Sequence, residues 1–83
     1  MPFFVYIIYS EKLDKYYIGY TEDIPVRLAQ HNSGISTFTA KAADWILKCS
    51  EQQPTREAAM QREKQIKQKK SRKYIEWLIS SVG

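Results

Sequence analysis

The first twenty residues consist of two apolar runs separated by a polar break. Phe3–Tyr9 is a continuous apolar and aromatic run, which is typical of a central strand covered on both faces. Ser10–Asp14 is polar enough to turn, and Lys15–Tyr20 is a second run rich in residues that favour strands. The pattern therefore predicts a β-hairpin at the start of the chain.

A helix is expected next, because Asp23 can cap it and Pro25 is tolerated in a first helical turn. We expect this helix to extend to about His31 and to end at Asn32–Gly34. The residues that follow, Ile35–Ala43, are small and polar and are interpreted as a loop.

The second half of the chain predicts one strand and two helices. Trp45–Ser50 is expected to be a short third strand, with Cys49 as a core residue, before a break at Gln52–Pro54. Thr55 can cap a helix that ends near residue 68, and Ser71 can cap another that ends near residue 80. In the last helix, three residues have core-facing spacing: Tyr74, Trp77 and Leu78.

These elements follow the order β-β-α-β-α-α. The order predicts an α+β fold, a small three-stranded antiparallel sheet flanked by three helices. The 83 residues are expected to form one domain, residues 1–83, with one modest core.

Composition excludes several classes of protein. No stretch approaches the roughly 20 apolar residues of a membrane span, and no signal peptide is recognisable at the N-terminus. Cys49 cannot form an internal disulfide, and one cysteine with one histidine cannot build a structural zinc site. A cytoplasmic location is the default expectation.

The net charge of +4 is concentrated in the second half of the chain. Residues 1–50 carry five basic and five acidic side chains, whereas residues 56–73 carry eight basic and two acidic ones. A field of this sign attracts polyanions, although a solvated helix face is the simpler interpretation of a charge run seen alone.

The hairpin brings tyrosines together. If Tyr9 faces Asp14, then Tyr6 stands directly opposite Tyr17 on one face of the sheet. An ordinary aromatic core pair would explain this equally simply. Gly19 shares that face, and a glycine inside a strand indicates that a helix, a phosphate or a base comes close to the backbone.

The first helix places two groups with possible chemistry four residues apart. Arg27 can hold phosphate oxygens in a bidentate way, and His31 can exchange a proton near neutral pH. The alternative is an exposed pair at a helix edge.

The second helix contains an anomaly. Glu63 lies within the apolar stripe formed by Ala59, Met60 and Ile66. A carboxylate there is costly unless it binds a metal or forms an ion pair, with Arg27 or Lys67 as the possible partners. One carboxylate can suffice for Mg²⁺, which keeps several waters and takes other oxygens from phosphate.

Together these residues resemble the GIY-YIG nuclease superfamily. The first motif stands as Phe4-Val5-Tyr6, with phenylalanine in place of the leading glycine, and the second is intact as Tyr17-Ile18-Gly19. Arg27, His31 and Glu63 match the arginine, the residue four positions later and the metal-binding glutamate of the family. The match extends over roughly residues 3–79 and is closest to short, stand-alone members.

The resemblance implies a metal-dependent endonuclease that hydrolyses phosphodiester bonds. Tyr6, Tyr17, Arg27, His31 and Glu63 would be catalytic, with Glu63 holding one Mg²⁺ or Mn²⁺ ion and Arg27 stabilising charge on phosphate. Tyr6, Tyr17 and His31 remain alternatives for the general base. The asparagine that larger relatives carry 12–15 residues after the glutamate is absent from the corresponding window, residues 75–78.

These features support two leading hypotheses and a third, weaker one. The first is nicking of DNA with low sequence specificity by a monomer or weak homodimer, in repair or recombination. The second is a nucleic-acid-binding module that does not cut. A third, weaker hypothesis is a protein-interaction domain with Trp45 or Trp77 at its surface. For the first two, the expected nucleic-acid contacts are Gly19, Arg56, Arg62, Lys64, Lys67, Lys70, Arg72 and Lys73.

Overall fold

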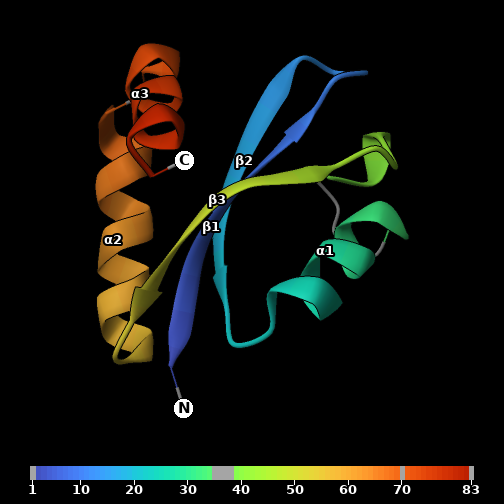
Figure 1. The fold of residues 1–83 in the computed structure, drawn as a ribbon. Coiled ribbons are helices and arrows are strands. Elements are labelled where there is room, and N and C mark those ends of the chain that lie inside the picture. Colours follow the sequence, from blue (N-terminus) through green and yellow to red (C-terminus); the bar gives the residue numbers. More distant parts are fainter. Residues whose placement is uncertain (1, 35–38, 70, 83) are drawn as a thin grey trace.

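The computed structural model describes residues 2–34, 39–69 and 71–82 (Figure 1). Along the chain, the elements are β1 (Phe3–Ser10), β2 (Lys15–Thr21), α1 (Ile24–Asn32), the short 3₁₀ helix η1 (Thr39–Lys41), β3 (Ile46–Gln53), α2 (Arg56–Lys69) and α3 (Arg72–Val82). The predicted α+β fold and its element order are confirmed. Within the described ranges, no helix has the length and apolar character needed to cross a membrane.

The three strands form one antiparallel sheet in the order β2-β1-β3. The first strand in the chain is therefore the central one, as its continuous apolar sequence predicted. Both later strands lie at the edges of the sheet. The third strand is longer than expected, since pairing with β1 continues to Gln53.

The predicted hairpin register is wrong by two residues. Tyr9 pairs with Tyr16 rather than with Asp14, so Tyr6 faces Gly19 and Tyr17 faces Ile8. The reason is the turn, which takes four residues after Ser10 and holds Asp14 at φ 52°. A shift of two residues keeps side chains on their original face, so Tyr6 and Tyr17 still share one surface of the sheet.

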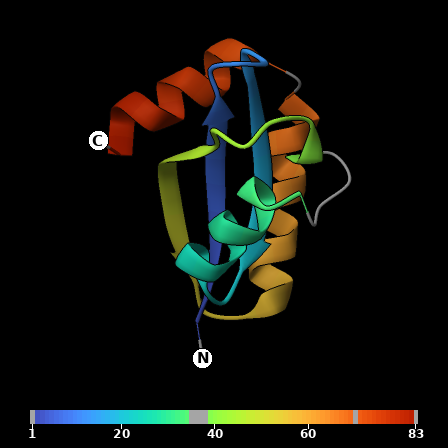
Figure 2. The same cartoon turned by 90° about the vertical axis from the view of Figure 1, so that its right-hand side faces the viewer.

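Helices cover both faces of the sheet (Figures 1 and 2). The α2/α3 side holds one apolar cluster, comprising Val5, Ile7, Ile18, Ala59, Ile66 and Leu78. The α1 side holds a second cluster, comprising Tyr6, Ile8, Ala42 and Trp45. Successive residues of β1 point to opposite faces, so this one strand supplies the floor of both clusters.

The predicted helix caps are confirmed. The side chains of Asp23, Thr55 and Ser71 each accept a hydrogen bond from a backbone N–H in the first turn of the following helix. The start of α1 is fixed in this way. Near its end, the Asn32 amide bonds both the backbone oxygen and the backbone nitrogen of Trp45, at 3.0 and 2.7 Å.

Two expectations about burial are wrong, and one expectation about a loop is restricted. Met60 and Trp77 were expected to face the core, but they are 46% and 60% exposed. Helix α2 buries only a narrow stripe, and Trp77 lies beyond the edge of the apolar face of α3, stacked on Tyr74. The expected loop Ile35–Ala43 contains η1, and its residues 35–38 lie outside the described residues.

Candidate active site

A cavity of about 380 Å³ opens beside β2, between α1 and α2. Four of the five predicted catalytic residues line it, and the fifth, His31, lies directly behind Tyr6. The β2 strand supplies the floor, α1 supplies the arginine, and α2 supplies the carboxylate. The lining residues are Tyr6, Tyr17, Gly19, Tyr20, Thr21, Arg27 and Glu63.

Gly19 gives the Tyr6 phenol its position. A Cβ atom at Gly19 would lie 2.6 Å from the Tyr6 hydroxyl oxygen and 2.8 Å from its ring carbon Cζ. Tyr6 is the cross-strand partner of Gly19, and its ring occupies the space that a side chain at Gly19 would need. The close approach that the strand glycine indicated is therefore made by a phenol of the protein itself.

Tyr6 and His31 form a buried hydrogen-bonded pair, with 2.7 Å between the phenol oxygen and Nε2. Burial raises the pKa of Tyr6 to about 12, although the nearby Arg27 lowers that pKa by a smaller amount. Burial, assisted by the Arg27 guanidinium, lowers the pKa of His31 to about 4. At neutral pH both groups are uncharged, and a neutral imidazole can accept the phenol proton at Nε2.

Tyr17 and Arg27 line the cavity together with Tyr6. The Tyr17 ring packs edge-on against His31, with 5.0 Å between ring centroids. The Arg27 side chain is half-buried, and its Nη1 donates to the Gln30 side chain at 2.9 Å. That bond holds the guanidinium along α1, so its other donors can serve a negatively charged group in the cavity.

Glu63 completes the wall formed by α2. Its side chain is 18% exposed, and its Oε1 accepts from Lys67 Nζ at 2.6 Å. Of the two ion-pair partners that the sequence left open, the structure has Lys67. The same ammonium group lies 5.7 Å from the centre of the Tyr17 ring, so Lys67 connects the carboxylate with the tyrosine.

Two of the predicted nucleic-acid contacts, Arg62 and Arg72, are engaged in ion pairs within the protein. Arg62 makes two bonds to Glu51 on β3, and Arg72 bonds Asp14 in the β1–β2 turn. The Arg62 guanidinium thus connects α2 to the edge strand β3, and the Arg72 guanidinium connects α3 to the hairpin turn. Of the remaining predicted cations, Lys67 pairs with Glu63. The others are Arg56, Lys64 and Lys73, which are exposed, and Lys70, which lies outside the described residues.

The donor set fits one hard divalent cation with few protein ligands. In the parts of the chain that the structure describes, no group of three or more histidine, cysteine, aspartate or glutamate side chains could hold a metal. Glu63 is the one carboxylate that lines the described cavity, where hydroxyl groups surround it. A single carboxylate matches Mg²⁺, which keeps most of its waters and takes oxygens from phosphate.

Two features of the site were missed from the sequence. Thr21 and Tyr20 line the cavity, and Lys67, already expected as a possible partner of Glu63, also lies over the Tyr17 ring. Thr21 follows Gly19 by two and thus shares its face, so strand alternation could have indicated it. The contact between Lys67 and Tyr17 depends on how α2 packs against the edge of β2, which no local pattern specifies.

The cavity thus brings an arginine, a carboxylate and several hydroxyl groups together beside the Tyr6–His31 pair. Residues 2–75 match the GIY-YIG catalytic domain family, so the chain belongs to this family, which is of nuclease type. The structure is similar to the solution NMR structure of the UPF0213 protein BH0048 from Bacillus halodurans. The TM-score is 0.62, the identity is 32%, and the match covers 100% of this chain and 87% of that one. No curated protein matches the chain.

Proposed function

We propose that this chain is a metal-dependent endonuclease that nicks DNA with little sequence preference. The observation that carries the proposal is the gathering of Tyr6, Tyr17, Arg27 and Glu63 around one cavity, with His31 bonded to the first. Hydrolysis of a phosphodiester needs a proton acceptor, charge neutralisation and positioning. The cavity contains a residue suited to each task.

The Tyr6–His31 pair is the proton acceptor in this scheme. Alone, neither member is suitable, because Tyr6 has a pKa near 12 and His31 is fully buried. Together they provide a relay in which the Tyr6 oxygen takes a proton from the attacking water while its own proton passes to Nε2. Tyr17, whose hydroxyl lies in the same cavity, orients the water.

Arg27 stabilises the developing charge on the phosphate. Its guanidinium is held by Gln30 and can donate two parallel bonds to phosphate oxygens. Preorganised donors of this kind contribute about 10²–10³ in rate, since no reorganisation is needed as charge develops.

Glu63 would hold the divalent ion, Mg²⁺ or Mn²⁺, after releasing Lys67. A bound ion supplies charge neutralisation at the phosphate and makes water a better nucleophile. The chain contributes a fixed, half-buried carboxylate on the rigid helix α2. Because one such site cuts one strand, nicking is expected unless two molecules act together.

The test is cleavage of supercoiled plasmid and of single-stranded circular DNA with Mg²⁺, Mn²⁺ or EDTA. Glu63→Gln should lose at least about 10²-fold in rate. Glu57→Gln, on the same helix but outside the cavity, should cut like the unchanged protein. Full activity of purified Glu63→Gln would rule out the metal assignment.

A second candidate is a binding module that does not cut. Two observations favour it: Glu63 is neutralised by Lys67, and the chain's only asparagine, Asn32, is occupied by Trp45. This function predicts salt-dependent DNA binding that survives both EDTA and Glu63→Gln, with no nicks at any metal concentration. The plasmid assay separates the two candidates.

A further inference from the structure

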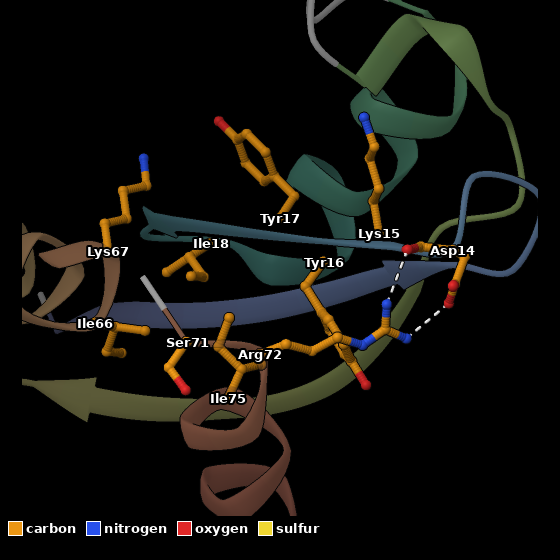
Figure 3. Close-up of a pocket in the computed structure, with 10 residues that line it drawn as sticks. All are labelled: Asp14, Lys15, Tyr16, Tyr17, Ile18, Ile66, Lys67, Ser71, Arg72 and Ile75. Carbon is orange, nitrogen blue, oxygen red and sulfur yellow. Dashed lines mark hydrogen bonds and ion pairs between the residues drawn. The ribbon is translucent and has the colours of Figure 1, made fainter. Parts of the chain in front are cut away.

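A second, larger cavity lies along the outer edge of β2, on the side toward α2 and α3 (Figure 3). Its volume of about 540 Å³ falls within the range of small-molecule sites, roughly 300–1,000 Å³. Its inner surface is formed mainly by three isoleucines and the ring of Tyr16. The lining residues are Asp14, Lys15, Tyr16, Tyr17, Ile18, Ile66, Lys67, Ser71, Arg72 and Ile75.

The rim of this cavity is cationic. Lys15 and Lys67 point to the same side of β2 as Tyr17, whereas Arg72 lies over the Tyr16 ring, with its central carbon 5.3 Å from the ring centre. Arg72 is fixed there by Asp14 and Glu76. An apolar interior with cations on the rim suits a flat, weakly polar group that carries negative charge beside it.

The cavity adjoins the candidate active site. Tyr17 lines both cavities, and Lys67, on the rim of the larger one, bonds the active-site residue Glu63. Strand alternation explains the arrangement, because Tyr17 points toward α1 while its neighbours Tyr16 and Ile18 point toward α2 and α3. A chain that crosses the edge of β2 would therefore contact both cavities.

We infer that this cavity binds a nucleobase of the substrate, next to the phosphate that is cut. This inference rests on the proposed nuclease function and deepens it. A phosphate beside Arg27 and Glu63 leaves the neighbouring nucleotide at the edge of β2, where Lys67 meets its backbone. Its base then enters among Ile18, Ile66 and Ile75, because apolar side chains and aromatic rings accept the faces of any base.

The inference defines the substrate class. A base inside a duplex is stacked and paired on its inner edge, so it reaches such a cavity only when it is unpaired or turned out of the helix. The substrate is thus a strand with an unpaired nucleotide beside the cut. The interior offers few polar groups to read a base edge, so this contact selects for the presence of a base and not for its identity.

Binding in EDTA tests the inference without cleavage. The probes are two fluorescein-labelled DNA strands of twelve nucleotides, one of thymidines and one in which every base is replaced by hydrogen. We expect the thymidine strand to bind at least ten-fold more tightly. Ile75→Phe, which fills the cavity, should reduce the difference to two-fold or less. The matched control Ile79→Phe, one turn later on α3, should preserve it.

Methyl NMR of the unchanged protein locates the contact and does not depend on how the variants fold. The thymidine strand should shift the methyl signals of Ile18, Ile66 and Ile75, and the strand without bases should not. Equal binding of the two strands would overturn the inference and leave the nuclease proposal intact. If neither strand binds, the nuclease proposal fails as well. If the thymidine strand leaves the isoleucine methyl signals unchanged, as expected for a cavity that binds a protein partner instead, the inference is also overturned.

Discussion

The two faces of the sheet use the same strand for opposite purposes. On the α2/α3 face, Val5 and Ile7 of β1 pack against aliphatic side chains. On the α1 face, the alternate residues Tyr6 and Ile8 lie with His31 and Trp45, and polar groups are buried among them. One face of the protein supplies apolar burial, whereas the other holds hydrogen-bonded groups that could act on a substrate.

The difference shows how a chain of 83 residues can carry both a core and a site. Buried polar groups cost free energy unless they are bonded, and no buried side-chain polar atom in the described residues lacks a partner. Both faces bury apolar side chains, and the polar groups on the α1 face stay ordered because each has a hydrogen-bond partner.

Arg27→Met gives the strongest test of the difference between the two faces of the sheet. It should lower the rate of DNA cleavage by about 10²–10³-fold, because the cavity loses its permanent cation. The free energy of unfolding should fall by about 1 kcal/mol or less, since the half-buried guanidinium loses its bond to Gln30 and its favourable interaction with the Tyr6 phenol. Steady-state nicking and urea unfolding provide the two measurements.

The matched control is Arg62→Met. Its guanidinium is bonded to Glu51 on the far edge of the sheet, at 2.8 and 3.1 Å. We expect it to cut normally and to lose up to about 1 kcal/mol of stability. A reversed pattern, with Arg62 essential and Arg27 dispensable, would contradict the assignment of the site.

Leu78→Ala tests the apolar face. Leu78 is 5% exposed in the α2/α3 cluster, and its truncation should cost about 2–5 kcal/mol in unfolding free energy. Cleavage per folded molecule should stay unchanged. The exposed neighbour Trp77→Ala should cost less than about 0.5 kcal/mol, and a larger loss there would show that the indole has a structural role.

Acid should destabilise the α1 face specifically. The pKa of His31 is about 4 in the folded chain and about 6.5 when unfolded, so the unfolded state binds the proton first. This stabilising contribution is complete above pH 6.5 and is lost as the pH falls to 4. The loss amounts to about 3 kcal/mol at 1.36 kcal/mol per unit.

His31 is the only histidine, so its imidazole signals in an NMR titration report this pKa directly. Urea midpoints measured from pH 7 to 4 give the corresponding stability. An ordinary titration midpoint near 6.5 would mean that the imidazole is solvated and that its bond to Tyr6 is not kept in solution.

Gly19→Ala should have a smaller effect. The added methyl would lie within 3 Å of the Tyr6 phenol, so the ring must move, at a cost of about 1–3 kcal/mol. Cleavage should fall as the Tyr6–His31 bond lengthens. Gly34→Ala is the control: nothing lies within 4 Å of its added methyl, so it should lose stability through its φ of 85° but keep its activity.

Local chemistry was enough to predict most of the fold. The three helix caps are short-range signals, and the uninterrupted apolar run from Phe3 marked the central strand. The register was not predictable in the same way. It depends on how many residues the turn takes and on Ser10, whose hydroxyl is bonded to Asp44 from a distant part of the chain.

The candidate site was predicted less completely. The anomaly of a carboxylate on an apolar stripe indicated Glu63, while strand pairing and helix spacing singled out the other four candidates. The family resemblance then implied their catalytic roles. Their roles remain predictions. The i,i+4 spacing had indicated Lys67 as one of two possible partners of Glu63, and the structure has that pair. That a second cavity opens beside Tyr17 depends on packing between α2 and β2, which leaves no mark in local sequence.

The unequal burial of the two tryptophans has a practical consequence. Trp45 is 2% exposed beneath α1, and Trp77 is 60% exposed on α3. In fluorescence, acrylamide should quench only the second indole of the native chain and both indoles after unfolding. A single chain thus carries one optical reporter for its interior and another for its surface, without any added label.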